Sequence, residues 1–61
     1  MGGLLCGKRV LVVEDEWNIR RMIKLFLQKE GCEVLEAADA VSARTSIMND
    51  SPNVVILDIV L

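Results

Sequence analysis

The sequence predicts an α/β fold in which a parallel three-stranded sheet, in the order 2-1-3, carries a helix on each face. Two short apolar runs at residues 10–13 and 54–57 are rich in β-branched residues, which is typical of strands covered on both faces. Apolar residues recur at helical spacing between them, over residues 17–29. The connections between these segments are short, so right-handed crossovers must join the successive strands.

The first strand, at residues 10–13, ends at an acidic run, after which an amphipathic helix is predicted over residues 17–29. Asp15 or Asn18 is expected to cap its start. Gly31 is expected to end it by adopting the left-handed conformation that follows many helices. The apolar side of this helix comprises Ile19, Met22, Ile23, Phe26 and Leu27.

The second half of the chain repeats this alternation. Residues 32–37 read as a strand that is more polar than the first, which favours a position at a sheet edge. Asp39 is a suitable N-cap for a short helix over residues 40–48. A dense turn signal then precedes the third strand, at residues 54–57, which is expected to be buried. The apolar side of the short helix would be Ala40, Val41, Ala43, Ile47 and Met48.

Composition excludes several classes of protein. The 61 residues allow one small domain, and a hydrophobic content of 52% argues against disorder. Seven basic and nine acidic residues give a net charge of −2, so direct nucleic-acid binding is not expected. No run of about 18 apolar residues is present, so we expect no membrane span. The basic residues of the first helix, which we interpret as a solvated face, are Arg20, Arg21 and Lys24.

Residue types limit the chemistry further. The chain has no histidine, which excludes Ser-His-Asp and Cys-His nucleophile pairs and the usual zinc sites. Its two cysteines, Cys6 and Cys32, lack metal-binding spacing and suit a reducing, cytoplasmic setting. A disulfide between them would form only if the strict geometric requirements of that bond were met.

Three carboxylates follow the two apolar strands. Glu14 and Asp15 come after the first strand and Asp58 after the third, and we call these residues the acidic cluster. Adjacent strands lie about 4.8 Å apart, so Asp15 and Asp58 are expected to face each other. Two such charges about 5 Å apart repel by about 3 kcal/mol at an effective dielectric near 20. Mg²⁺ would remove this repulsion, because it prefers carboxylates, carbonyls and waters.

Residues 8–16 and 54–58 together resemble the receiver domain of two-component response regulators, which has a flavodoxin-like fold. The resemblance runs from about Lys8 to Leu61 and covers the first half of that domain. It implies that a histidine kinase phosphorylates Asp58 with the assistance of Mg²⁺. Haloacid-dehalogenase phosphatases also use a strand-end Asp, but they need a second Asp where this chain has Val60.

The resemblance also implies roles for the neighbouring residues. Asp15 and Asp58 would coordinate Mg²⁺ directly, Glu14 would help through a water molecule, and the backbone carbonyl of Val60 would be a further ligand. Glu16 would contribute only charge at the helix start. The protein is therefore expected to be a cytoplasmic phosphorelay module and not an enzyme.

The extent of the match leads to expectations about stability and assembly. Residues 1–7 are expected to form a flexible leader and residues 8–61 a truncated receiver. In the family, a Ser or Thr and a Lys bind the phosphoryl group, and they do not occur in this sequence at matching positions. Phosphorylation of this chain on its own should therefore be absent or weak. The strand at residues 54–57 would expose an edge and pair with a second copy. The alternative function is a structural half-domain that assembles through this edge without phosphoryl transfer.

Overall fold

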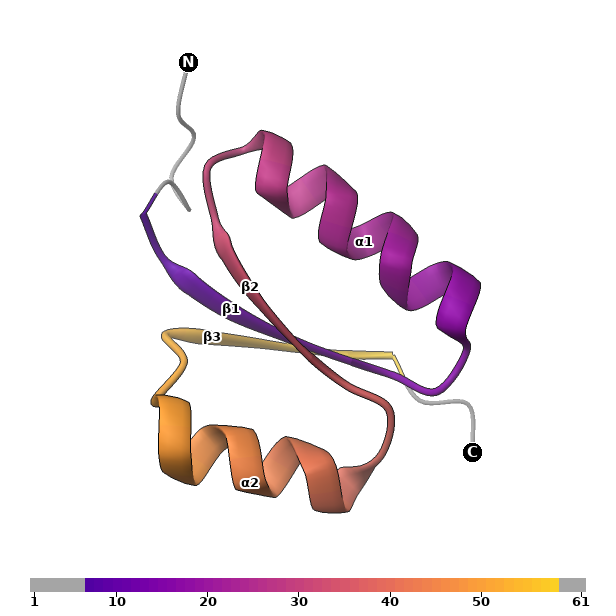
Figure 1. Cartoon of the computed structure of the whole chain (residues 1–61), viewed down its shortest axis with the longest axis vertical. Helices are drawn as coiled ribbons and strands as arrows, with labels where there is room; N and C mark the ends of the chain where they lie inside the picture. Colours follow the sequence, from indigo (N-terminus) through magenta and orange to yellow (C-terminus); the bar gives the residue numbers. More distant parts are fainter. Residues whose placement is uncertain (1–6, 59–61) are drawn as a thin grey trace.

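The computed structural model describes residues 7–58, which form a parallel sheet with one helix on each face (Figure 1). Each turn of the chain between a strand and a helix is short, as the sequence predicts. The elements are, in chain order, β1 (Arg9–Glu14), α1 (Trp17–Lys29), β2 (Glu33–Ala37), α2 (Ala40–Asp50) and β3 (Val54–Asp58).

The strand order is β2-β1-β3, and both pairings are parallel. This confirms the predicted α/β fold and the order 2-1-3. β2 pairs with β1 from Arg9↔Glu33 to Val13↔Ala37. β3 pairs with the other side of β1, from Val10↔Val54 to Glu14↔Asp58. β1 is therefore the central strand, and the more polar β2 lies at an edge as expected.

Side chains of β1 divide the core into two clusters, because successive residues of a strand point to opposite faces. Val10 and Val12 pack with Leu27 of α1, beside Cys32. On the other face, the cluster comprises Leu11, Val13, Ala37 and Ala43. The four apolar residues of β1 are fully buried. Both helices lie over β1 and β2, one on each face (Figure 1).

α1 begins without the expected side-chain cap. Its N-cap residue is Glu16, whose side chain makes no capping hydrogen bond, so the expectation of a cap from Asp15 or Asn18 was wrong. The Glu14 side chain instead accepts a hydrogen bond from the backbone N–H of Glu16 at 3.0 Å. At the other end, Gly31 has φ 87°, which confirms the predicted left-handed residue after the helix.

α2 begins as predicted and ends later than expected. Asp39 Oδ1 accepts a hydrogen bond from the backbone N–H of Ser42 at 2.8 Å, which confirms the N-cap. The helix continues to Asp50, two residues beyond the predicted end, and stops where Ser51 takes the left-handed conformation before Pro52. Of the predicted apolar side only Ala43 is buried, where it packs with Leu11, Val13 and Ala37 of the sheet. The exposed members are Ala40, Val41, Ile47 and Met48.

β3 is less buried than expected. Val54 and Ile56 pack against the cluster beneath α1, but Val55 is 40% exposed and Leu57 68% exposed. The reason is that α2 covers β1 and β2, so nothing among residues 7–58 covers the second face of β3. α1 also exposes part of its predicted apolar side, at Ile19, Met22 and Phe26.

Asn53 fastens the start of β3 to the start of β1. Its side-chain oxygen accepts a hydrogen bond from the Arg9 backbone N–H at 2.9 Å, and its own N–H donates to the Arg9 carbonyl at 2.8 Å. The Arg9 guanidinium donates to the Asp50 carbonyl at the end of α2 and to Glu33 on β2. These contacts set the β3 register, and hence which residues meet at its other end.

Some sequence-based expectations concern residues outside the described range. These are the leader as far as Cys6, the pairing of Cys6 with Cys32, and the carbonyl of Val60. Within residues 7–58, no helix has the length and apolar character needed to cross a membrane.

Candidate functional site

The acidic cluster lies at the carboxyl ends of β1 and β3, the edge where open α/β sheets bind ligands. In the parallel ladder, Glu14 is the Cα partner of Asp58, and Asp15 follows one residue further along the chain. Strand pairing thus brings residues 14–15 and 58 to one place, although they are more than forty positions apart in the sequence. Glu14 and not Asp15 is the residue directly across from Asp58 in this register.

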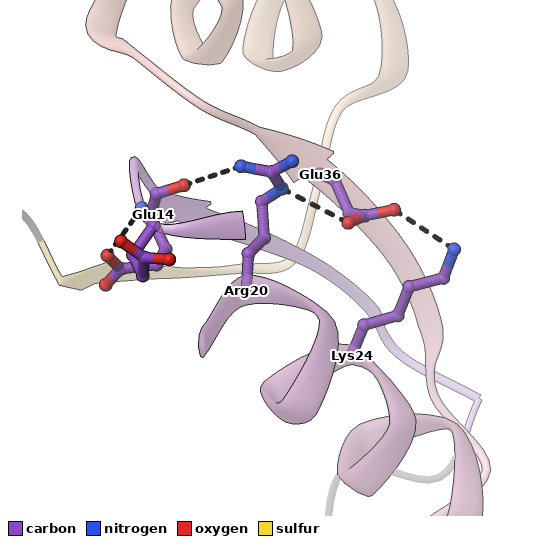
Figure 2. Close-up of polar contacts among 5 residues, drawn as sticks. Glu14, Arg20, Lys24 and Glu36 are labelled. Atoms are coloured by element: carbon purple, nitrogen blue, oxygen red, sulfur yellow. Dashed lines mark hydrogen bonds and ion pairs between the residues drawn. The ribbon is translucent and has the colours of Figure 1, made fainter. Parts of the chain in front are cut away.

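Among residues 7–57, Glu14 is the one buried charged residue, with 2% of its surface exposed. A carboxylate removed from water must be hydrogen-bonded, and one oxygen accepts the N–H of Glu16 (Figure 2). Asp15 and Glu16 are exposed. The Glu14 carboxylate therefore points inward, where it orders the start of α1, whereas the next residue, Asp15, is exposed to solvent.

The acidic cluster has the chemistry of a hard-cation site, since all its side-chain donors are carboxylate oxygens, which Mg²⁺ prefers. Among the side chains of residues 7–57, no three from Asp, Glu, Cys or His are gathered closely enough to form a metal site. The donor types fit Mg²⁺, and one to two carboxylates with waters would suffice for it. The metal ligands named above remain a prediction.

Arg20, which the sequence led us to interpret as part of a solvated face, is instead engaged at this edge. Its side chain is only 14% exposed. Nη1 donates to the backbone carbonyl of Glu14 at 2.9 Å, and Nε donates to Glu36 Oε1 at 3.2 Å (Figure 2). The i,i+4 spacing of Arg20 and Lys24, together with an acidic residue on the predicted edge strand, was the available signal for this network.

Glu36 of β2 accepts from two basic residues of α1. Lys24 Nζ contacts Oε2 at 3.0 Å, while Arg20 occupies Oε1. The hydrogen bond from Lys24 holds the pKa of Glu36 below its usual value; partial burial raises it, and Arg20 lowers it further. The network thus links α1 to the edge strand β2: two positive charges one turn apart on the helix pair with one negative charge on the strand.

A shallow, open pocket lies beside this network, between the starts of α1 and α2. The Arg21 guanidinium lies 5.7 Å from the centre of the Trp17 ring at its margin, which is a cation–π distance. The pocket is lined by Trp17, Arg20, Glu36, Ala37, Ala38 and Ser42.

Comparison with known proteins gives a consistent family match. The model of the response regulator receiver domain matches residues 10–61. Protein PilG of Pseudomonas aeruginosa is 36% identical over 55 residues, which cover 90% of this chain and 41% of PilG. The probable transcriptional regulator ycf27 of Cyanophora paradoxa is 43% identical over 54 residues, which cover 88% of this chain and 23% of that protein.

A further relative is the phosphate regulon transcriptional regulatory protein PhoB of Pseudomonas aeruginosa. It is 39% identical over 54 residues, which cover 88% of this chain and 24% of PhoB. The chain thus spans less than half the length of each of these three relatives. No solved structure matches the chain significantly.

Proposed function

Because this chain belongs to the response regulator receiver domain family, we propose that Asp58 is the residue on which it accepts a phosphoryl group from a histidine kinase. The family makes it a two-component signalling module. The observation that carries the proposal is the β3 register, in which Asp58 is the partner of Glu14 at the carboxyl end of the central strand. A reactive carboxylate there has acidic neighbours that suit a cation.

We propose that the acidic cluster holds Mg²⁺ for this reaction. Asp15 and Asp58 are the proposed carboxylate ligands, Val60 would add its backbone carbonyl, and Glu14 would act through a water molecule. The burial of Glu14 and its hydrogen bond to Glu16 support an indirect role for that residue, because one of its oxygens is already occupied. Bound Mg²⁺ would supply positive charge opposite the phosphoryl oxygens.

The proposed transfer forms one bond and breaks another. A carboxylate oxygen of Asp58 attacks the phosphorus atom of a phosphohistidine on the kinase, forming an acyl phosphate. The bond between phosphorus and the imidazole nitrogen breaks, and the imidazole keeps the electron pair. No general base is needed for this step, because an attacking carboxylate has no proton to lose.

Mass spectrometry after incubation with acetyl phosphate tests this proposal. We expect slow modification of the wild-type chain by one phosphoryl group, located at Asp58, when Mg²⁺ is present and none when a chelator replaces it. Asp58→Asn should abolish the modification. Glu16→Gln is the matched control, since Glu16 is acidic and exposed but lies outside the acidic cluster. Modification at other residues and never at Asp58 would contradict the assignment.

A second candidate function is assembly through β3, favoured by the exposure of Val55 and Leu57. Among the described strands β3 pairs on one side only, and residues 54–57 carry no charge. An unpaired apolar strand edge recruits another strand. We propose that a two-fold axis pairs two copies antiparallel there, which would place Asp58 of one copy near Asn53 of the other and keep like charges apart.

Light scattering coupled to size-exclusion chromatography tests the assembly. We expect a dimer whose dissociation constant rises when Val55→Lys introduces a charge at the edge. Val41→Lys adds the same charge at an exposed position of α2 and should leave the dimer unchanged. A compact monomer at all concentrations would refute the idea.

A further inference from the structure

We propose that Arg20 is a positioning residue for the acidic cluster, because its guanidinium binds the carbonyl of the peptide group that joins Glu14 to Asp15. The contact is a hydrogen bond of 2.9 Å from Nη1 to the Glu14 carbonyl oxygen. This inference rests on the proposed Mg²⁺-dependent function and adds a residue that the motif of acidic residues does not contain.

The geometry explains how a contact with a carbonyl can orient a side chain one residue away. The Glu14 carbonyl belongs to the peptide group that joins Glu14 to Asp15, and that group is planar. Holding its oxygen therefore restricts the plane and with it the position of the Asp15 Cα. The Glu14 side chain restrains the next peptide by accepting the Glu16 N–H at 3.0 Å. Asp15 thus lies between two peptide groups that each have a side-chain partner, while its own side chain is exposed.

The Arg20 side chain is itself held in place. Nε donates to Glu36 Oε1 at 3.2 Å, and the second oxygen of Glu36 receives Lys24 Nζ at 3.0 Å. The arginine guanidinium presents several donors in one rigid plane, so it can contact a carboxylate on β2 and a carbonyl on β1 together. Figure 2 shows the guanidinium between these two acceptors. A lysine at this position could satisfy one of them but not both in the same geometry.

Charge also favours this arrangement. An isolated cation beside the acidic cluster would repel an incoming divalent ion. Glu36, which Arg20 shares with Lys24, offsets part of the guanidinium charge at close range and so reduces the electrostatic opposition to Mg²⁺. The Arg20 side chain is 14% exposed and that of Glu36 33%, so solvent screens part of this pairing.

Calorimetric titration of the full chain with Mg²⁺ tests the role without depending on phosphorylation. Residues that orient metal ligands typically change the affinity by about 10–100-fold when they are removed, so Arg20→Ala should raise the Kd for Mg²⁺ by about tenfold. Arg20→Lys, which keeps the charge, should also bind Mg²⁺ more weakly than the wild type does. Arg21→Ala is the matched control: it removes the same charge from the next position of α1, where the exposed guanidinium lies over the Trp17 ring, and its Kd should stay within about twofold of wild type.

Thermal unfolding of each protein without Mg²⁺ is measured beside the titration, so that a variant that fails to fold is recognised. If Arg20→Ala does not fold, Arg20→Lys decides the question, since it retains the charge and the aliphatic stem. Wild-type affinity in a folded Arg20 variant would overturn the positioning role, and so would an equal loss in Arg21→Ala. Wild-type protein that binds no Mg²⁺ would contradict the proposed function itself, and the role of Arg20 with it.

Discussion

The network around Glu36 shows how single residues connect elements that the sequence keeps apart. Glu36 lies on β2, and its two cationic partners lie one turn apart on α1. The partners hold its pKa below the usual value, mainly through the Lys24 hydrogen bond. A carboxylate with a depressed pKa contributes stability above the pKa of the unfolded chain, and this stability is lost as the pH falls through the folded pKa.

Acidification should therefore affect the wild type more than Glu36→Gln. Near pH 7 the variant should be less stable by up to about 1 kcal/mol, a value discounted for the exposure of the pair. The difference should shrink as the pH falls below 4.5, the ordinary pKa of this group, because the unfolded chain takes up a proton there and the folded chain only at lower pH. Urea unfolding at pH 7 and pH 3 measures it. A gap that is constant or widens in acid would contradict this account.

At the level of elements, the two helices begin in different ways. α2 has a side-chain cap from Asp39, whereas α1 begins at Glu16 without one and depends on the Glu14 carboxylate in the preceding turn. The hydrogen bond from the Ser42 backbone N–H holds the pKa of Asp39 below its usual value. The start of α2 is thus a local property of its sequence, while the start of α1 depends on a residue of the sheet.

Asp39→Ala should lower the melting temperature, because the Ser42 N–H loses its acceptor. Asp39→Asn should stay close to wild type, since asparagine is an equally good N-cap. Thermal unfolding followed by circular dichroism separates these variants. Equal melting temperatures for Asp39→Ala and Asp39→Asn would show that the cap contributes nothing.

For the whole molecule, stability depends on β1. The central strand supplies both core clusters, and its four apolar residues are fully buried. A chain of 61 residues is expected to have only about 3–9 kcal/mol of total stability. The exposed apolar residues on α1, α2 and β3 contribute little to this, because burial and not composition provides the hydrophobic free energy.

Leu11→Ala should consequently cost about 2–5 kcal/mol, through lost burial and the cavity that remains. This is a large part of the expected total, so we predict a chain that is unfolded or nearly so. Leu25→Ala makes the same chemical change at a residue that is 48% exposed and should cost much less. Denaturant unfolding of both variants measures the difference, and similar costs would argue against β1 as the centre of the core.

Much of the candidate site could be predicted from the sequence because it follows strand ends. Glu14 and Asp58 each come directly after a short apolar run, and parallel strands bring their carboxyl ends to one edge. The register was not predictable at the level of one residue, so Glu14 and not Asp15 proved to be the ladder partner of Asp58. Arg20 escaped notice because its partners are a main-chain carbonyl and a residue of another strand, which no local pattern records.

The sequence by itself determined the alternation of strands and helices, the α2 cap at Asp39 and the left-handed turn at Gly31, because these depend on neighbouring residues and on backbone preferences. Tertiary structure decided which apolar residues are covered and which charges meet. Met22 and Leu57 have the same apolar character as Leu27, yet only Leu27 is buried. Burial depends on which other elements pack against a residue, and that is a property of the assembled sheet and helices.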